Sequence, residues 1–145
     1  MRAKELMIGD WVLCDMNAQS DYEFDNVDYQ PYQIANGEDI DYAIENNKIG
    51  DADVYQPIPL TSELLEANGF KKFNFHDIEG QHQWSWWHDT LTSVSLWCRE
   101  LNDDPKDGWM IRIESPLATC CHKVEHVHEL QQTLRVCKIE KEIEL

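Results

Sequence analysis

The sequence predicts an α+β protein: a small SH3-like β-rich unit at the N-terminus, a short helix, an antiparallel sheet and a C-terminal helix. Short runs of alternating apolar and polar residues, separated by turn residues, indicate strands over most of the chain. Two segments, Thr61–Asn68 and Val127–Cys137, have helical features instead. We expect an acidic β-rich unit over residues 1–60 and a second unit over 61–145, or one compact domain containing both.

In the N-terminal part, Gly9-Asp10 is a turn that leads into a strand. Asn36-Gly37 is a dipeptide typical of a hairpin turn, and it separates two runs in which apolar residues alternate with polar ones. The strands expected here begin at Trp11, pass through Tyr32 and Ile34 and then through Ile40, Tyr42 and Ile44, and end with Val54–Ile58.

The segment that follows has the clearest local signal. Thr61 is a good N-cap, and Leu60 and Leu65 hold the positions of a hydrophobic staple. Glu63 suits the first turn, where the helix dipole favours a carboxylate, and Gly69 supplies a left-handed stop. The pattern therefore predicts a short helix of about two turns.

In the second half, alternation and turn residues predict four strands and then a helix with Val127, Leu130 and Leu134 on one face. In the tail, Ile139–Leu145, apolar residues alternate with glutamates, which favours a charged edge strand. The four strands are expected at Lys72–His76, Gln83–His88, Ser93–Arg99 and Trp109–Glu114.

Charge is distributed unevenly along the chain. Between Glu5 and Phe70 there are fifteen acidic residues and one basic residue, Lys48, which accounts for −14 of the formal charge of −16. Such a surface repels phosphate, so we expect this half to bind neither nucleic acid directly nor an anionic membrane surface.

Location follows from what the sequence lacks. Residues Met1–Glu5 are polar and do not begin an export signal, and no stretch approaches the ~20 apolar residues of a spanning helix. The five cysteines include no CxxC pair, so we expect reduced thiols in a cytoplasmic protein.

Three segments in order carry a family resemblance: Leu6–Val12, Pro57–Thr61 continuing through Asn68-Gly69-Phe70, and Val127–Gln131. Together they resemble a family of small uncharacterised proteins of gut anaerobic bacteria, often found in phage-like or mobile elements. The resemblance implies a cytoplasmic accessory role and assigns no catalytic residue or cofactor. The chain departs from the pattern at Lys138, where a glycine is common, and in the longer, more acidic stretch Asp15–Asp28.

His122-Lys123-Val124-Glu125-His126 is an HxxEH string, as in a class of zinc proteases that needs both histidines on one helical turn. The resemblance implies that the last helix begins at about Val127, which leaves this string in an extended conformation. Residues four apart in a strand are ~13 Å apart, so the two histidines could not bind one ion. We therefore expect no enzyme and no cofactor, and a small zinc hydrolase using His122, Glu125 and His126 remains an alternative. Weaker metal candidates are Cys120, His122 and His126, within a looser group that also holds Cys121 and His128.

Two stretches are candidate contact surfaces. Alternation along a strand puts Trp84 and Trp86 on one face and Trp87 on the other. Trp97 is a further candidate. Burial on both sides would explain these residues equally well, whereas exposed Trp is enriched at binding hot spots. The second stretch has carboxylates spaced as in a calcium loop but lacks the required Gly and Glu, so a solvated loop is the simpler interpretation; its members are Asp21, Glu23, Asp25 and Asp28.

We therefore interpret the chain as a non-enzymatic protein-interaction module whose partner is another protein. This interpretation is compatible with a homo-oligomer. An alternative from a different class is a DNA-mimicking inhibitor, in which Asp and Glu occupy the cationic groove of a nucleic-acid-binding protein.

Overall fold

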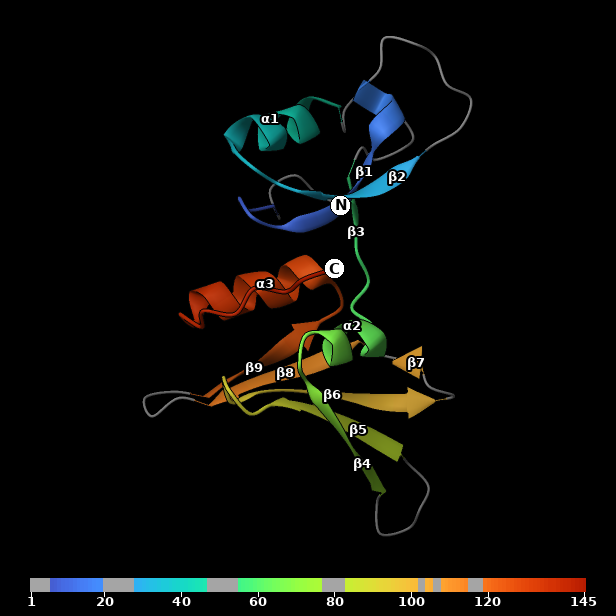
Figure 1. Ribbon diagram of the computed structural model, residues 1–145, viewed down its shortest axis with the longest axis vertical. Helices are drawn as coiled ribbons and strands as arrows, with labels where there is room; N and C mark the ends of the chain where they lie inside the picture. The colour runs from blue at the N-terminus through green and yellow to red at the C-terminus, as the bar shows by residue number, and fades with distance from the viewer. Residues whose placement is uncertain are drawn as a thin grey trace. The chain divides into compact units, whose positions relative to one another are not determined.

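The computed structural model describes residues 6–19, 28–46, 55–76, 83–101, 104–105, 108–114 and 119–145. It divides into two units: Met1–Pro59 with His126–Gln132, and Leu60–Glu125 with Thr133–Leu145. Among the described residues each unit has its own antiparallel sheet, and helices accompany both (Figure 1). The predicted α+β class is confirmed. The SH3-like arrangement of the first unit stays a prediction.

The sheet of the first unit has strand β1 (Trp11–Asp15) at its centre, between β2 (Tyr29–Gln33) and β3 (Tyr55–Pro57). Both pairings are antiparallel, and a short 3-10 helix, η2 (Met16–Gln19), follows β1. Alternation along β1 directs Val12 and Cys14 into the core. That core also contains Leu6, Ile34, Ala43 and Tyr55.

Helix α1 (Gly37–Asn46) replaces the strand predicted through Ile40, Tyr42 and Ile44, so that prediction is wrong. The cause is Asn36, which caps the helix instead of turning a hairpin: its Oδ1 accepts from the N–H groups of Glu38 (2.8 Å) and Asp39 (3.3 Å). Asp39 completes the cap, since its Oδ2 accepts from the Asn36 N–H (3.2 Å).

The predicted short helix is confirmed as α2 (Ser62–Ala67), which belongs to the second unit. Thr61 Oγ1 accepts from the Leu64 N–H (3.3 Å), and the staple residues Leu60 and Leu65 are both buried. The helix ends in a Schellman motif at Gly69 (φ 83°), where the Phe70 N–H donates to the Leu65 carbonyl (3.0 Å).

The sheet of the second unit confirms the four predicted strands, with ends differing by up to two residues, and adds two more. Its order is β4-β5-β6-β8-β9, with β7 paired to β6, and all pairings are antiparallel. The strands are β4 (Lys71–His76), β5 (Gln83–Asp89), β6 (Val94–Leu101), β7 (Asp104–Pro105), β8 (Trp109–Glu114) and β9 (Thr119–Val124).

The predicted C-terminal helix is confirmed as α3 (Val127–Val136), and its apolar residues Val127, Leu130 and Leu134 are buried. It ends in a second Schellman motif: the Ile139 N–H donates to the Leu134 carbonyl (2.9 Å), and Lys138 takes the left-handed position (φ 56°). None of the described helices has the length and apolar content needed to cross a bilayer.

The edge strand predicted over Ile139–Leu145 is wrong, because this tail is not in a strand. Side chains hold it to the second unit instead. Ile143 is buried, Lys141 pairs with Asp89 (3.2 Å), and Asn68 bonds the backbone of Glu144.

Candidate functional site

The two faces of the second sheet differ in exposure. On one face Trp87, Leu96 and Ile111 are buried. On the other face Trp97 and Met110 are 37% and 41% exposed. Because successive side chains of a strand point to opposite faces, each strand contributes residues to both surfaces. The sheet therefore has one face that fills a core and one that retains large apolar side chains at the surface.

The strand register aligns the exposed apolar residues. Phe73 of β4 is opposite Trp86 of β5, Trp86 is opposite Trp97 of β6, and Trp97 is opposite Met110 of β8. The rings of Phe73 and Trp86 contact each other, with centroids 5.4 Å apart. Phe73 is 44% exposed and Trp86 is half-buried. We call these four residues, which cross four strands side by side, the aromatic row: Phe73, Trp86, Trp97 and Met110.

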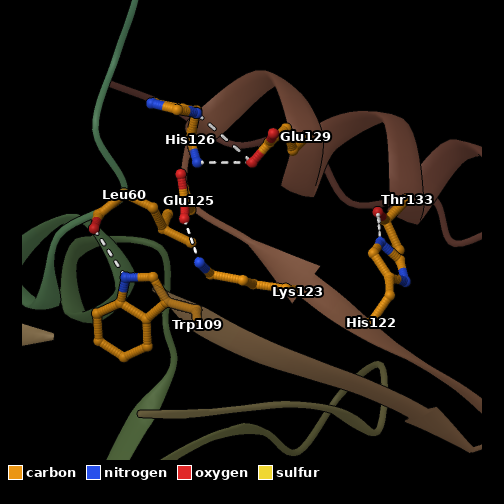
Figure 2. A network of polar contacts seen from close by, with 8 residues as sticks. All are labelled: Leu60, Trp109, His122, Lys123, Glu125, His126, Glu129 and Thr133. Atoms are coloured by element: carbon orange, nitrogen blue, oxygen red, sulfur yellow. Dashed lines mark hydrogen bonds and ion pairs between the residues drawn. The ribbon is translucent and has the colours of Figure 1, made fainter. Parts of the chain in front are cut away.

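Polar groups border the aromatic row. The His88 ring lies against Trp86, with centroids 5.2 Å apart, and its Nδ1 is 2.9 Å from Ser95 Oγ. Arg112 pairs with Glu114 (2.5 Å). Lys123 pairs with Glu125 (Figure 2). Carboxylates thus neutralise two cations beside the row.

The structure separates the predicted tryptophans. Trp86 and Trp97 lie in the aromatic row, as alternation predicts for an exposed face. Trp87 is only 3% exposed and contacts Trp109 edge-on at 6.5 Å, so its inclusion in the contact surface is wrong. The backbone of Trp84 is in β5, and its side chain lies outside the described residues.

The second predicted surface falls largely outside the described residues, since Asp21, Glu23 and Asp25 are not among them. Asp28 is described and exposed, and its Oδ1 accepts from Gln30 Nε2 (2.7 Å).

The residues of the HxxEH string have separate partners (Figure 2). His122 is in strand β9, as the extended interpretation predicts, and its Nε2 is 2.9 Å from Thr133 Oγ1. His126 precedes α3, where its N–H donates to Glu129 Oε2 (3.0 Å). Glu125 pairs with Lys123. The string therefore runs from the end of strand β9 to the residue before helix α3, and it does not form one turn of helix.

The predicted opposite orientation of the adjacent cysteines agrees with the register of β9. Cys120 Sγ is 3.4 Å from His122 Nδ1, on the strand face that reaches Thr133, whereas Cys121 is exposed and alternates with both. Across the described parts of the chain, no group of three or more His, Cys, Asp or Glu residues is arranged to hold a metal ion. His128 is buried in α3 and its ring stacks on that of His126.

Sequence reasoning missed two members of the aromatic row, Phe73 and Met110. Alternation within β8 does place Met110 on the face of the strand away from the buried Trp109. Only the pairing of β4, β5, β6 and β8 shows that the exposed residues are neighbours. Trp109 fixes the buried side, because its Nε1 donates to the Leu60 carbonyl (2.8 Å; Figure 2).

No protein-family model, curated protein or solved structure matches this chain. The geometry alone therefore defines the candidate site. It is the face of one antiparallel sheet that carries a row of exposed aromatic and methionine side chains. Such a surface offers large apolar contacts and π-faces, which are groups for binding.

Proposed function

We propose that this chain is a non-enzymatic protein-interaction module, a cytoplasmic accessory protein of a phage-like or mobile element. Its partner is a cationic protein that docks on the aromatic row. The observation that carries this proposal is the alignment of Phe73, Trp86, Trp97 and Met110 on one exposed sheet face.

The composition of the row supports a protein partner. Trp and other aromatics, together with Met and Arg, are the residues enriched at the centres of protein interfaces. A lone exposed apolar residue needs no explanation, whereas an aligned set of four indicates a contact surface. Each aromatic ring can bury about 150–250 Å² of its own surface when covered.

Charge selects the kind of partner. The chain carries −16 in total, so two copies repel each other and phosphate is repelled as well. Two of the cations beside the row, Arg112 and Lys123, are already paired with Glu114 and Glu125. A cationic protein is attracted at long range, and its Lys or Arg side chains can rest on the faces of Trp86 and Trp97.

The test compares Trp97→Ala with Leu91→Ala, a change of another exposed apolar residue (90% exposed). Proteins captured from the host by wild type and Leu91→Ala, but not by Trp97→Ala, are purified and titrated calorimetrically. We expect a basic partner whose Kd rises at least tenfold, about 1.4 kcal/mol, with Trp97→Ala. Equal binding by all three chains would refute a role for the row, and so would a captured partner that is a nucleic acid.

The second candidate function is the DNA-mimicking inhibitor, and helix α1 favours it. Glu38, Asp41 and Glu45 are exposed at spacings of three and four, which places them along one helical face. Like charges at this spacing weaken a helix by a few tenths of a kcal/mol each, a cost that a cationic groove would offset.

The two candidates share a cationic partner and differ in the surface that binds it. Glu38→Gln, Asp41→Asn and Glu45→Gln combined should abolish binding if the acidic helix is the contact. The same triple variant should only slow association, and lose its effect in high salt, if the aromatic row is the contact.

A further inference from the structure

Strand β9 and the end of α3 bring together two thiols and an imidazole in the second unit. Cys120 and His122 are two residues apart on one face of β9, and Thr133 and Cys137 are four apart on one side of the helix end. His122 bridges the elements: its Nδ1 is 3.4 Å from Cys120 Sγ and its Nε2 is 2.9 Å from Thr133 Oγ1. The Cys120 and Cys137 thiols are neighbours in this cluster.

The backbone holds both thiols in place. The Cys137 N–H donates to the Thr133 carbonyl (3.0 Å) at the helix end, and Cys120 is paired with Ile113 inside the sheet. Both side chains are partly exposed, so a small oxidant can reach them. Cys14 and Cys98 are buried, and Cys121 is exposed on the opposite face of β9. Within the described part of the chain, only this pair therefore combines neighbouring thiols with access to solvent.

We propose that Cys120 and Cys137 form a reversible disulfide when the protein meets a peroxide. The Cys120 thiolate attacks one oxygen of hydrogen peroxide and the O–O bond breaks, which forms a sulfenic acid; the departing hydroxide takes up the proton that Cys120 gave to His122 and leaves as water. The Cys137 thiolate then attacks the Cys120 sulfur and displaces its hydroxyl, which forms the S–S bond; the departing hydroxide takes up the proton lost by the Cys137 thiol and leaves as a second water. Two thiols are thereby oxidised by two electrons and the peroxide is reduced.

The surroundings assign the two roles. With its proton on Nε2 and donated to Thr133, His122 presents the Nδ1 lone pair to Cys120 and accepts the thiol proton, which generates the attacking thiolate. Burial and the neighbouring Cys120 raise the pKa of Cys137 above its usual value of 9.0, which disfavours its thiolate and suits Cys137 to the second, resolving step. The bond ties β9 to the end of α3.

The test treats the reduced full-length protein with hydrogen peroxide, blocks free thiols with an alkylating reagent, and maps peptides by mass spectrometry. We expect a Cys120–Cys137 cross-link, loss of two hydrogen atoms from the intact mass, and reversal by dithiothreitol. Cys121→Ser is the matched control and should leave the cross-link unchanged.

Two variants test the roles. Cys137→Ser should stop at a Cys120 sulfenic acid that dimedone traps. His122→Asn, which retains a polar group facing Thr133, should slow cross-linking by about tenfold or more without preventing it. Oxidation confined to Cys121, or a link between different molecules in place of Cys120–Cys137, would overturn the proposal. An unchanged rate for His122→Asn would overturn the assignment of the proton acceptor.

Discussion

Asn68 holds the backbone of Glu144 from both sides. Its Nδ2 donates to the Glu144 carbonyl and its Oδ1 accepts from the Glu144 N–H, each over 2.8 Å. The same Nδ2 also donates to the Leu64 carbonyl (2.9 Å), one of the carbonyls at the C-terminal end of α2. One amide therefore closes a helix and fixes the tail by the pair of hydrogen bonds that a neighbouring strand would supply.

Asn68→Ala should lower the free energy of unfolding by about 1–2 kcal/mol. The variant loses three hydrogen bonds, each worth about 0.5–1.5 kcal/mol net and reduced here by solvent exposure. Urea unfolding measures the loss, and faster amide exchange in the tail locates it. Glu66→Ala, an exposed change in the same helix, is the control. Equal stability of the two variants would show that the amide does not hold the tail.

Lys138→Gly should stabilise the protein by about 0.5–1 kcal/mol. Lys138 occupies the left-handed position that ends α3 (φ 56°), which costs about 1–2 kcal/mol for a residue with a side chain, and glycine avoids that cost. Part of the gain is offset because glycine is more flexible in the unfolded chain. The shift in Tm measures the balance.

Lys138→Ala separates backbone strain from charge, because it removes the same ammonium group and retains a Cβ. It should show none of the gain. If Lys138→Ala stabilises the protein as much as Lys138→Gly, the lost charge is the cause and the conformational argument fails.

Local signals explain which elements could be predicted. Helix α2 is determined by Thr61 and Gly69, which act within a few residues of it. Helix α1 was missed because residues four apart, such as Ile40 and Ile44, share a face in a strand and in a helix alike. Ala43 distinguishes the two, since it lies beside Ile40 only in a helix, and it is fully buried. The tail was missed because Asn68, a partner 76 residues away in the sequence, replaces a neighbouring strand.

The candidate site was partly predictable for a similar reason. Alternation alone predicts that Trp86 faces away from Trp87. The register of four strands decides which exposed residues become neighbours. The sequence of one strand does not specify its partner strands or their register. Phe73 and Met110 could therefore be assigned to the row only from the pairing.

Asp39→Ala should destabilise α1 by about 1–2 kcal/mol, because the carboxylate accepts from the N–H groups of Ala35 and Asn36 and from the Tyr32 hydroxyl (3.0 Å). Burial and this last hydrogen bond raise the pKa of Tyr32. Hydrogen exchange of the α1 amides measures the loss locally.

Asp41→Ala is the matched control, because it removes the same charge from an exposed position in the same helix. Relief of repulsion between carboxylates should make it neutral or slightly stabilising. Similar exchange rates in the two variants would mean that Asp39 acts only through its charge and that the cap contributes nothing.

Asp89→Asn should destabilise the protein by about 2–4 kcal/mol near neutral pH. Asp89 is 2% exposed, accepts from Thr92 Oγ1 (2.6 Å) and the Leu91 N–H (3.2 Å), and pairs with Lys141 (3.2 Å). Replacing it with a neutral amide removes one partner of a buried ion pair. Urea unfolding of both proteins from neutral pH down to about pH 3 measures the difference and its pH dependence.

The sign of that dependence follows from the pKa of Asp89. Burial alone would raise it, but the hydrogen bonds from Thr92 and Leu91 and the charge of Lys141 together lower it below 3.8. The stabilisation is therefore complete above the unfolded value of 3.8 and is lost as pH falls through the lower folded value. The gap between wild type and Asp89→Asn should narrow only at the acidic end. Glu142→Gln removes an exposed partner of Arg135 and should change stability by less than about 1 kcal/mol at any pH. If Asp89→Asn behaves like Glu142→Gln near neutral pH, the pair with Lys141 does not anchor the tail.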